Sequence, residues 1–137
     1  MLRPTWVFDL DNTLHDARPQ ILPHIDRSMT RYVAMHLAID EGAANALRIK
    51  FWREHGATLT GLMRHHGTDP HHFLWNTHQF PDLGRMLISE STLRHTLRRL
   101  PGRRIVFSNA PLSYVDLRVG ALAALPRLLG GLRKKRS

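Results

Sequence analysis

The chain has 137 residues, enough for one domain or for one domain with a small insert. It contains no cysteine, which excludes disulfides and thiolate metal sites. No apolar run is long enough to cross a membrane, and no signal-peptide core is present, so we expect a cytoplasmic protein without a membrane partner.

The formal net charge of +9 arises in the last third of the chain. Residues 91–137 hold 11 Lys and Arg residues against a single acid, Asp116. A basic tail can bind nucleic acid through its phosphates, or it can simply be a solvated end. The tail can also be an accident of translation, and nucleic-acid binding through residues 133–137 is the last of the alternatives.

The most informative stretch begins with a short apolar run at residues 6–8, which predicts a buried strand. Asp9, Asp11 and Thr13 follow this strand. Ligands of open α/β sheets collect at the carboxyl ends of the strands. Two close carboxylates repel each other, a bound Mg²⁺ relieves that repulsion, and a carboxylate can attack phosphorus. The alternative interpretation is an acidic turn that caps a helix.

The next part of the chain is expected to be helical. Its helix signals are apolar residues at helical spacing over 21–37, N-caps at Asp40, Thr58 and Asp69 with Pro70 behind it, and a terminating Gly56. A helical insert over 19–81, placed after the first strand, would form a lid over the carboxylates. Lids exclude water and contact the part of a substrate that does not react.

A group of histidines lies in this insert, at positions 65, 66, 71, 72 and 78. Imidazole is a common metal ligand, and His-rich tracts can bind zinc. No spacing such as H-E-x-x-H accompanies these residues, however. We therefore interpret them as a polar loop of the insert.

Two tryptophans of the insert, Trp52 and Trp75, have two interpretations. They could stack on a nucleobase, because any base offers a flat face. An aromatic residue in an amphipathic helix usually packs in the core. We expect both to be core residues.

A second buried strand is predicted over residues 103–107, after a helix that begins at Ser91. Ser108, Asn109 and Pro111 follow this strand. A hydroxyl at the carboxyl end of a strand, with a helix opening at the proline, suits a phosphate. The same residues also suit an ordinary turn.

Asp9-Leu10-Asp11-Asn12-Thr13 resembles the first motif of haloacid dehalogenase-like (HAD) phosphatases, and Ser108-Asn109 resembles their second. The amino-acid sequence of the insert, from Asn45 to Gly67, resembles that of the pyrimidine 5′-nucleotidase-like branch of that family. The resemblance covers residues 1 to about 115. It implies an α/β, HAD-like Rossmannoid core, incomplete with about two parallel strands, and an all-helical cap inserted after the first strand. The implied division is a core of 1–18 and 82–116, a cap of 19–81 and a basic, atypical tail of 117–137.

The resemblance also implies roles for individual residues. Asp9 would be the nucleophile that forms an aspartyl-phosphate, and Asp11 the general acid and base. Both would hold Mg²⁺, Asp11 through its backbone carbonyl. Thr13, Ser108 and Asn109 would position the phosphate. The implied substrate is a nucleoside monophosphate.

The chain departs from the family pattern after Ser108. The family's third motif, a lysine, and its fourth, an acidic pair, have no counterpart there, since only Asp116, Lys134 and Lys135 remain as candidates. We hypothesise a truncation or a frameshift after about residue 115. We therefore expect low stability, because a two-stranded sheet has open edges and faces, and weak or no phosphatase activity. A catalytically inactive remnant or binding module is the alternative.

Overall fold

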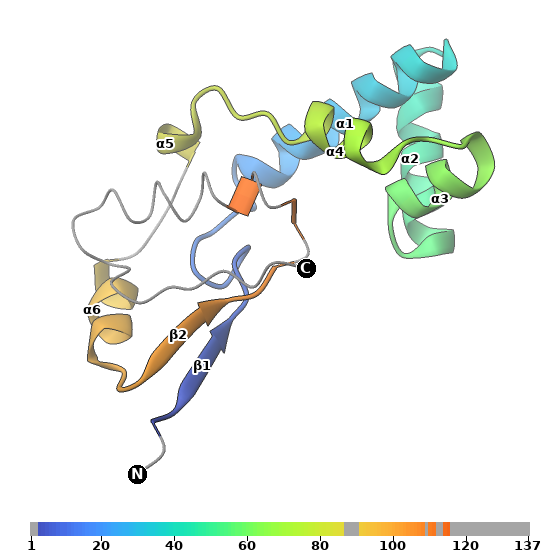
Figure 1. Ribbon diagram of the computed structural model, residues 1–137. Coiled ribbons are helices and arrows are strands. Elements are labelled where there is room, and N and C mark those ends of the chain that lie inside the picture. Colours follow the sequence, from blue (N-terminus) through green and yellow to red (C-terminus); the bar gives the residue numbers. More distant parts are fainter. Residues whose placement is uncertain (1–2, 87–90, 109, 112–113, 116–137) are drawn as a thin grey trace. The chain divides into compact units, whose positions relative to one another are not determined.

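The computed structural model describes residues 3–86, 91–108, 110–111 and 114–115 (Figure 1). The described chain is a mixture of helices and a two-stranded parallel sheet, which agrees with the predicted α/β class. Its elements are β1 (Thr5–Phe8), α1 (Ile21–Leu37), α2 (Glu41–His55), α3 (Thr58–His66), α4 (Pro70–Thr77), α5 (Leu83–Met86), α6 (Ser91–Arg99) and β2 (Arg103–Val106).

The chain divides into two compact units. The helical unit is Leu22–Gln79, and the strand unit comprises the described parts of Met1–Ile21 and Phe80–Ser137. The sequence placed the corresponding boundaries at 18/19 and 81/82, two to three residues from these. The tail of 117–137, with Lys134 and Lys135, and Asp116 lie outside the described residues.

The strand unit is organised by parallel pairing of β1 with β2, in a register that places Thr5 opposite Arg103 and Phe8 opposite Val106. Backbone hydrogen bonds extend the ladder at both ends, from Arg103 N to the Pro4 carbonyl (2.9 Å) and from Phe107 N to the Phe8 carbonyl (2.8 Å). Parallel strands require a long crossover, and here the whole helical unit lies within it.

Gly102 fits the start of this ladder for two reasons. Its φ of +93° lies in the region that favours glycine, and an added Cβ would lie 2.1 Å from the Pro4 carbonyl oxygen. Any side chain at this position would therefore push the two strands apart where their pairing begins.

The prediction that both strands are buried is wrong. Val7 is 63% exposed and Phe107 59%, and the Trp6 indole N–H is bonded to the Pro101 carbonyl at the surface. Strands of a parallel sheet are buried only when neighbouring strands and helices cover both faces. In the part of the chain that the structure describes, the sheet has two strands and lacks that cover.

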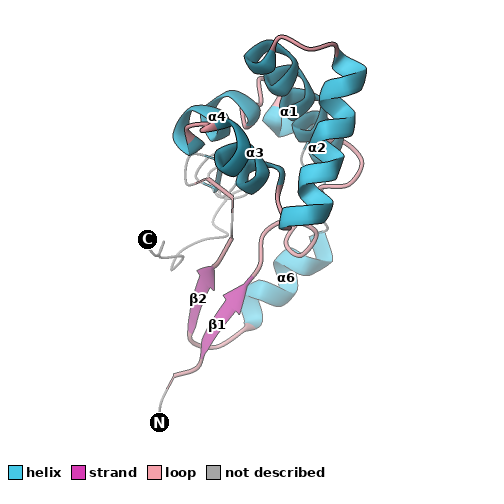
Figure 2. Cartoon of the chain, turned by 90° about the vertical axis from the view of Figure 1, so that its right-hand side faces the viewer, coloured by secondary structure: helices cyan, strands magenta, loops and turns pink. Residues whose placement is uncertain are grey.

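The helical unit has its own core, built from α1 to α4 (Figure 2). Its buried side chains are Tyr32, Val33, Ala44, Phe51, Leu62 and Phe73. The predicted helix over 21–37 is confirmed as α1. The Phe51 side chain of α2 packs directly on Gly61 of α3, where an added Cβ would lie 2.3 Å from the Phe51 ring.

Two of the predicted helix caps are confirmed. Asp40 accepts a hydrogen bond from Ala43 N (2.9 Å) at the start of α2, and Asp69 accepts one from His72 N (2.7 Å) at the start of α4. Gly56 ends α2 in a left-handed conformation with φ of +78°. These caps act within a few residues of sequence, which is why the sequence predicts them.

The prediction of Thr58 as an N-cap is wrong. The N-cap of α3 is Ala57, which has no side-chain capping bond, and Thr58 is the first helical residue. The Thr58 hydroxyl is buried and donates to the Arg48 carbonyl on α2 at 3.0 Å. A contact between helices thus takes the hydroxyl that the local sequence assigned to a cap.

The prediction of Trp52 and Trp75 as core residues is also wrong, because they are 59% and 65% exposed. Trp52 directly follows Phe51, and Trp75 lies two residues after Phe73; both phenylalanines face the core. Successive residues of an α-helix point about 100° apart, so the position after a core residue turns toward solvent.

Within the described chain, no helix has the length and apolarity that crossing a bilayer requires.

Candidate functional site

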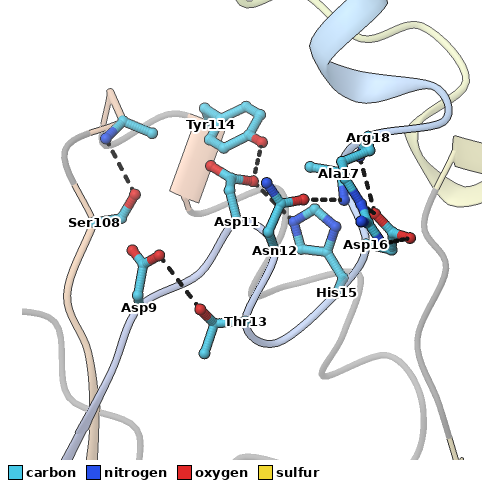
Figure 3. A network of polar contacts seen from close by, with 11 residues as sticks. Asp9, Asp11, Asn12, Thr13, His15, Asp16, Ala17, Arg18, Ser108 and Tyr114 are labelled. Atoms are coloured by element: carbon cyan, nitrogen blue, oxygen red, sulfur yellow. Dashed lines mark hydrogen bonds and ion pairs between the residues drawn. The ribbon is translucent and has the colours of Figure 1, made fainter.

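Polar residues follow both strands of the sheet at the same edge. Asp9 comes directly after β1, and Ser108 lies two residues after β2. Because Phe8 is paired with Val106 and Phe107 N is bonded to the Phe8 carbonyl, the two residues leave neighbouring strand ends (Figure 3). The structure therefore brings these two predicted site residues together, while Asn109 lies outside the described residues.

Asp9 is exposed to solvent, and its Oδ2 accepts a hydrogen bond from the Thr13 hydroxyl at 3.4 Å (Figure 3). Ser108 Oγ accepts a bond from Ala110 N at 3.1 Å. The second contact is the local turn that the sequence left open as an alternative, and it also fixes where the serine hydroxyl lies. Asp9 is thus an accessible carboxylate with one neighbouring hydroxyl already directed at it.

Asp11 is held much more tightly than Asp9. Its Oδ1 accepts the Tyr114 O–H at 2.5 Å and lies 2.9 Å from His15 Nε2. The His15 side chain is fully buried and that of Asp11 is 28% exposed. An ionised Asp11 requires the proton of this imidazole on Nε2, because a carboxylate can only accept. The two donors fix the orientation of the carboxylate (Figure 3).

The loop that carries these residues is compact because the local sequence closes it. Asn12 has φ of +59°, a left-handed conformation that asparagine tolerates better than most residues, and its Oδ1 accepts from Ala17 N at 3.0 Å. Leu14 N donates to the Leu10 carbonyl at 2.9 Å, and both leucines are buried. The acidic turn is therefore anchored beneath by apolar side chains.

An open cavity of about 590 Å³ adjoins this loop. It is lined by Asn12, Thr13, Leu14, His15, Asp16, Arg18 and Leu93. Among the described residues of that lining, Asp16 and Arg18 form a charged pair, joined by two contacts of 2.9 Å. The hydrogen bond from the Arg18 side chain, and next that from its backbone N–H, lower the pKa of Asp16 from 3.8 to about 2. The Arg18 charge is thereby largely compensated.

The residues of the loop fit Mg²⁺ in a limited way. Mg²⁺ prefers oxygen ligands and is commonly held by one or two carboxylates together with phosphate oxygens and water. Asp9 and Asp11 supply that minimum. Among the described residues, no group of three or more His, Cys, Asp or Glu side chains could hold a metal ion. Phosphate and water would have to provide most of the ligands.

The sequence reasoning did not identify His15 and Tyr114. His15 has a local signal, because it follows Asp11 at i+4 and pairs with it. Tyr114 has none, since 103 residues separate it from Asp11.

Comparison with models of protein families and with curated proteins finds no match to this chain.

Proposed function

We propose that this chain carries the first two motifs of a HAD-type phosphatase site. Its substrate is a nucleoside monophosphate, and its activity is low. The observation that carries the proposal is the parallel pairing of β1 and β2. This pairing brings Asp9 and Ser108 to one edge of the sheet, where ligands of α/β proteins bind. The substrate class rests on the resemblance of the helical insert.

In the first proposed step, the exposed Asp9 carboxylate attacks phosphorus and forms an aspartyl-phosphate. The bond from phosphorus to the ester oxygen breaks, and protonated Asp11 gives its proton to that oxygen. In the second step Asp11 takes a proton from water, which attacks the phosphorus and releases inorganic phosphate from Asp9. Thr13, Ser108 and Asn109 position the phosphate oxygens. Mg²⁺, when bound by Asp9 and Asp11, would neutralise part of the negative charge.

The contacts of Asp11 support its proposed role. A general acid must keep one orientation while the proton moves, and Tyr114 and His15 both restrict this carboxylate. Asp9, by contrast, is accessible, as a nucleophile must be. The two acids of one short motif therefore differ in accessibility and in how firmly the carboxylate is oriented.

The expectation of low activity has a physical reason. Phosphoryl transfer depends on positive charge around the phosphate, and the two proposed carboxylates add negative charge instead. The described residues that follow β2 include no lysine and no acid. Turnover well below that of ordinary phosphatases is the expected result.

The test is phosphate release from nucleoside monophosphates by the full chain in the presence of Mg²⁺. We expect slow release by the wild type, and a fall of about a hundredfold or more in Asp9→Asn, which removes the nucleophile. Asp16→Asn is the matched control, because Asp16 is a carboxylate of the same loop whose partner is Arg18. Equal release by the wild type and by Asp9→Asn would contradict the proposal.

The inactive alternative has its own signature in the same experiment. If the wild type releases no phosphate, but binds nucleoside monophosphates more weakly after Ser108→Ala, the chain is a binding remnant of such a site. If neither release nor binding is found, the proposed substrate class is wrong.

A further inference from the structure

We propose that His55 and His65 form a binding site for a divalent transition metal in the helical unit, with no residue of the acidic loop taking part. The Nε2 atoms of the two imidazoles lie 3.2 Å apart. His55 belongs to the last turn of α2, and His65 to the last turn of α3. The two ligands thus come from different helices whose packing sets their separation.

The separation matches what a metal ion requires. Nitrogen ligands lie about 2.0–2.1 Å from a tetrahedral Zn²⁺, so two of them are separated by roughly 3.3–3.4 Å. The observed 3.2 Å is close to this value. A metal ion could therefore replace the proton that the two nitrogens now share at nearly the same separation of the nitrogens, and both rings would tilt so that each nitrogen points at the ion.

The rings are also held in place. The imidazole of His65 stacks on the buried Phe51 ring, with centroids 5.3 Å apart and an angle of 9° between the planes. The His55 ring contacts the same phenylalanine, and its side chain is only 13% exposed. Because Phe51 restricts both rings, less side-chain freedom is lost when a metal binds.

The electrostatic surroundings favour a cation on two counts. Both histidines lie at helix C-termini, where the backbone carbonyls place partial negative charge. The Glu54 carboxylate lies 4.0 Å from His55 Nε2. Arg53 and Arg64 in the same two turns oppose this effect, so we expect moderate affinity.

The chemistry of the donors indicates which metals would bind. Imidazole suits Zn²⁺, Cu²⁺ and Ni²⁺, and affinity among these is expected to be highest for Cu²⁺. In the part of the chain that the structure describes, a third His, Cys, Asp or Glu ligand is not in place, so water would complete the coordination. The bound ion would link α2 to α3 and stabilise the helical unit.

The experiment measures Cu²⁺ and Zn²⁺ binding to the full chain without an affinity tag by calorimetry, and Cu²⁺ binding also by electron paramagnetic resonance. We expect His55→Ala and His65→Ala each to weaken binding of the tightest Cu²⁺ about tenfold or more. His71→Ala removes an exposed histidine of α4 and should leave that binding unchanged. The resonance spectrum of the wild type should show two nitrogen ligands at this site, and each variant should lose one of them.

The double variant distinguishes a shared site from independent histidines. If the two imidazoles hold one ion, the double variant should bind scarcely more weakly than either single variant. Losses that add up, or binding equal to that of the wild type in all three, would overturn the proposal and leave only the hydrogen bond between the rings. His55→Gln guards against misfolding, since its amide keeps a hydrogen-bonding group. Wild-type Cu²⁺ affinity in this variant would also overturn the proposal.

Discussion

The helical unit and the strand unit bury their apolar side chains in different places. In the helical unit, α1 to α4 enclose a common core that includes Phe51, Leu62 and Phe73. In the strand unit, the sheet side chains Val7 and Phe107 are exposed. The buried residues of the strand unit gather instead around the acidic loop, where Leu10 and Tyr114 are almost fully buried.

This difference follows from the geometry of the elements. Helices that pack against one another can close a core with residues near in sequence. A parallel sheet must be covered on both faces before its strands are buried. The helical unit therefore encloses a hydrophobic core of its own. The buried side chains of the strand unit lie instead around the loop that holds the polar residues of the site.

The largest expected effect is on the helical core. Phe73→Ala should lower the free energy of unfolding by about 3–5 kcal/mol, because it leaves a cavity in place of a buried ring. Phe107→Ala, which truncates a 59% exposed ring in the strand unit, should cost under about 1 kcal/mol. Chemical denaturation followed by far-ultraviolet circular dichroism measures both. Similar losses would show that the two units do not differ in this way.

A smaller effect is expected at the strand ladder. Gly102→Ala should destabilise the pairing of β1 with β2 by about 2–4 kcal/mol, through backbone strain and the clash with the Pro4 carbonyl. Gly67→Ala in the helical unit also has positive φ, but its Cβ would meet no atom within 4 Å, so about 1 kcal/mol is expected. Faster hydrogen exchange at the Arg103 and Phe107 amides should appear only in the Gly102 variant. Unchanged exchange there would contradict the ladder.

The smallest effects concern the caps of the helical unit, and they have opposite signs. Asp40→Ala should destabilise this unit by about 1 kcal/mol, because Ala43 N loses its acceptor. Ala57→Ser should stabilise it by a similar amount, because Ala57 has extended backbone angles that suit a cap but no side chain to act as one. Thermal unfolding should shift down for the first variant and up for the second. A shift of the same sign in both would contradict the assignment of these caps.

The features that the sequence predicted well depend on neighbours in sequence. Periodic apolar residues defined α1, and Asp40, Gly56 and Asp69 marked helix ends through contacts that span a few residues. The parallel partner of β1 was also expected. Two apolar runs, each followed by polar residues, are typical of strands whose carboxyl ends meet.

The features that were missed depend on contacts between distant segments. The Thr58 hydroxyl is taken by Arg48 on another helix, and Asp11 is bonded to Tyr114. Nothing in the spacing of these residues reports such partners. The burial of the strands was misjudged for a related reason. An apolar run indicates that a strand tends to be buried, but it does not show whether other segments of the chain cover it.

The parallel register has a consequence for how the chain acquires its structure. Trp6 is bonded to Pro101, 95 residues further along the sequence. During synthesis, the entire helical unit must therefore be made after β1 and before the partner strand β2 exists. Since closing so long a loop is entropically costly and slow, α1 to α4 should form early, and the acidic loop should wait, incomplete, until β2 emerges.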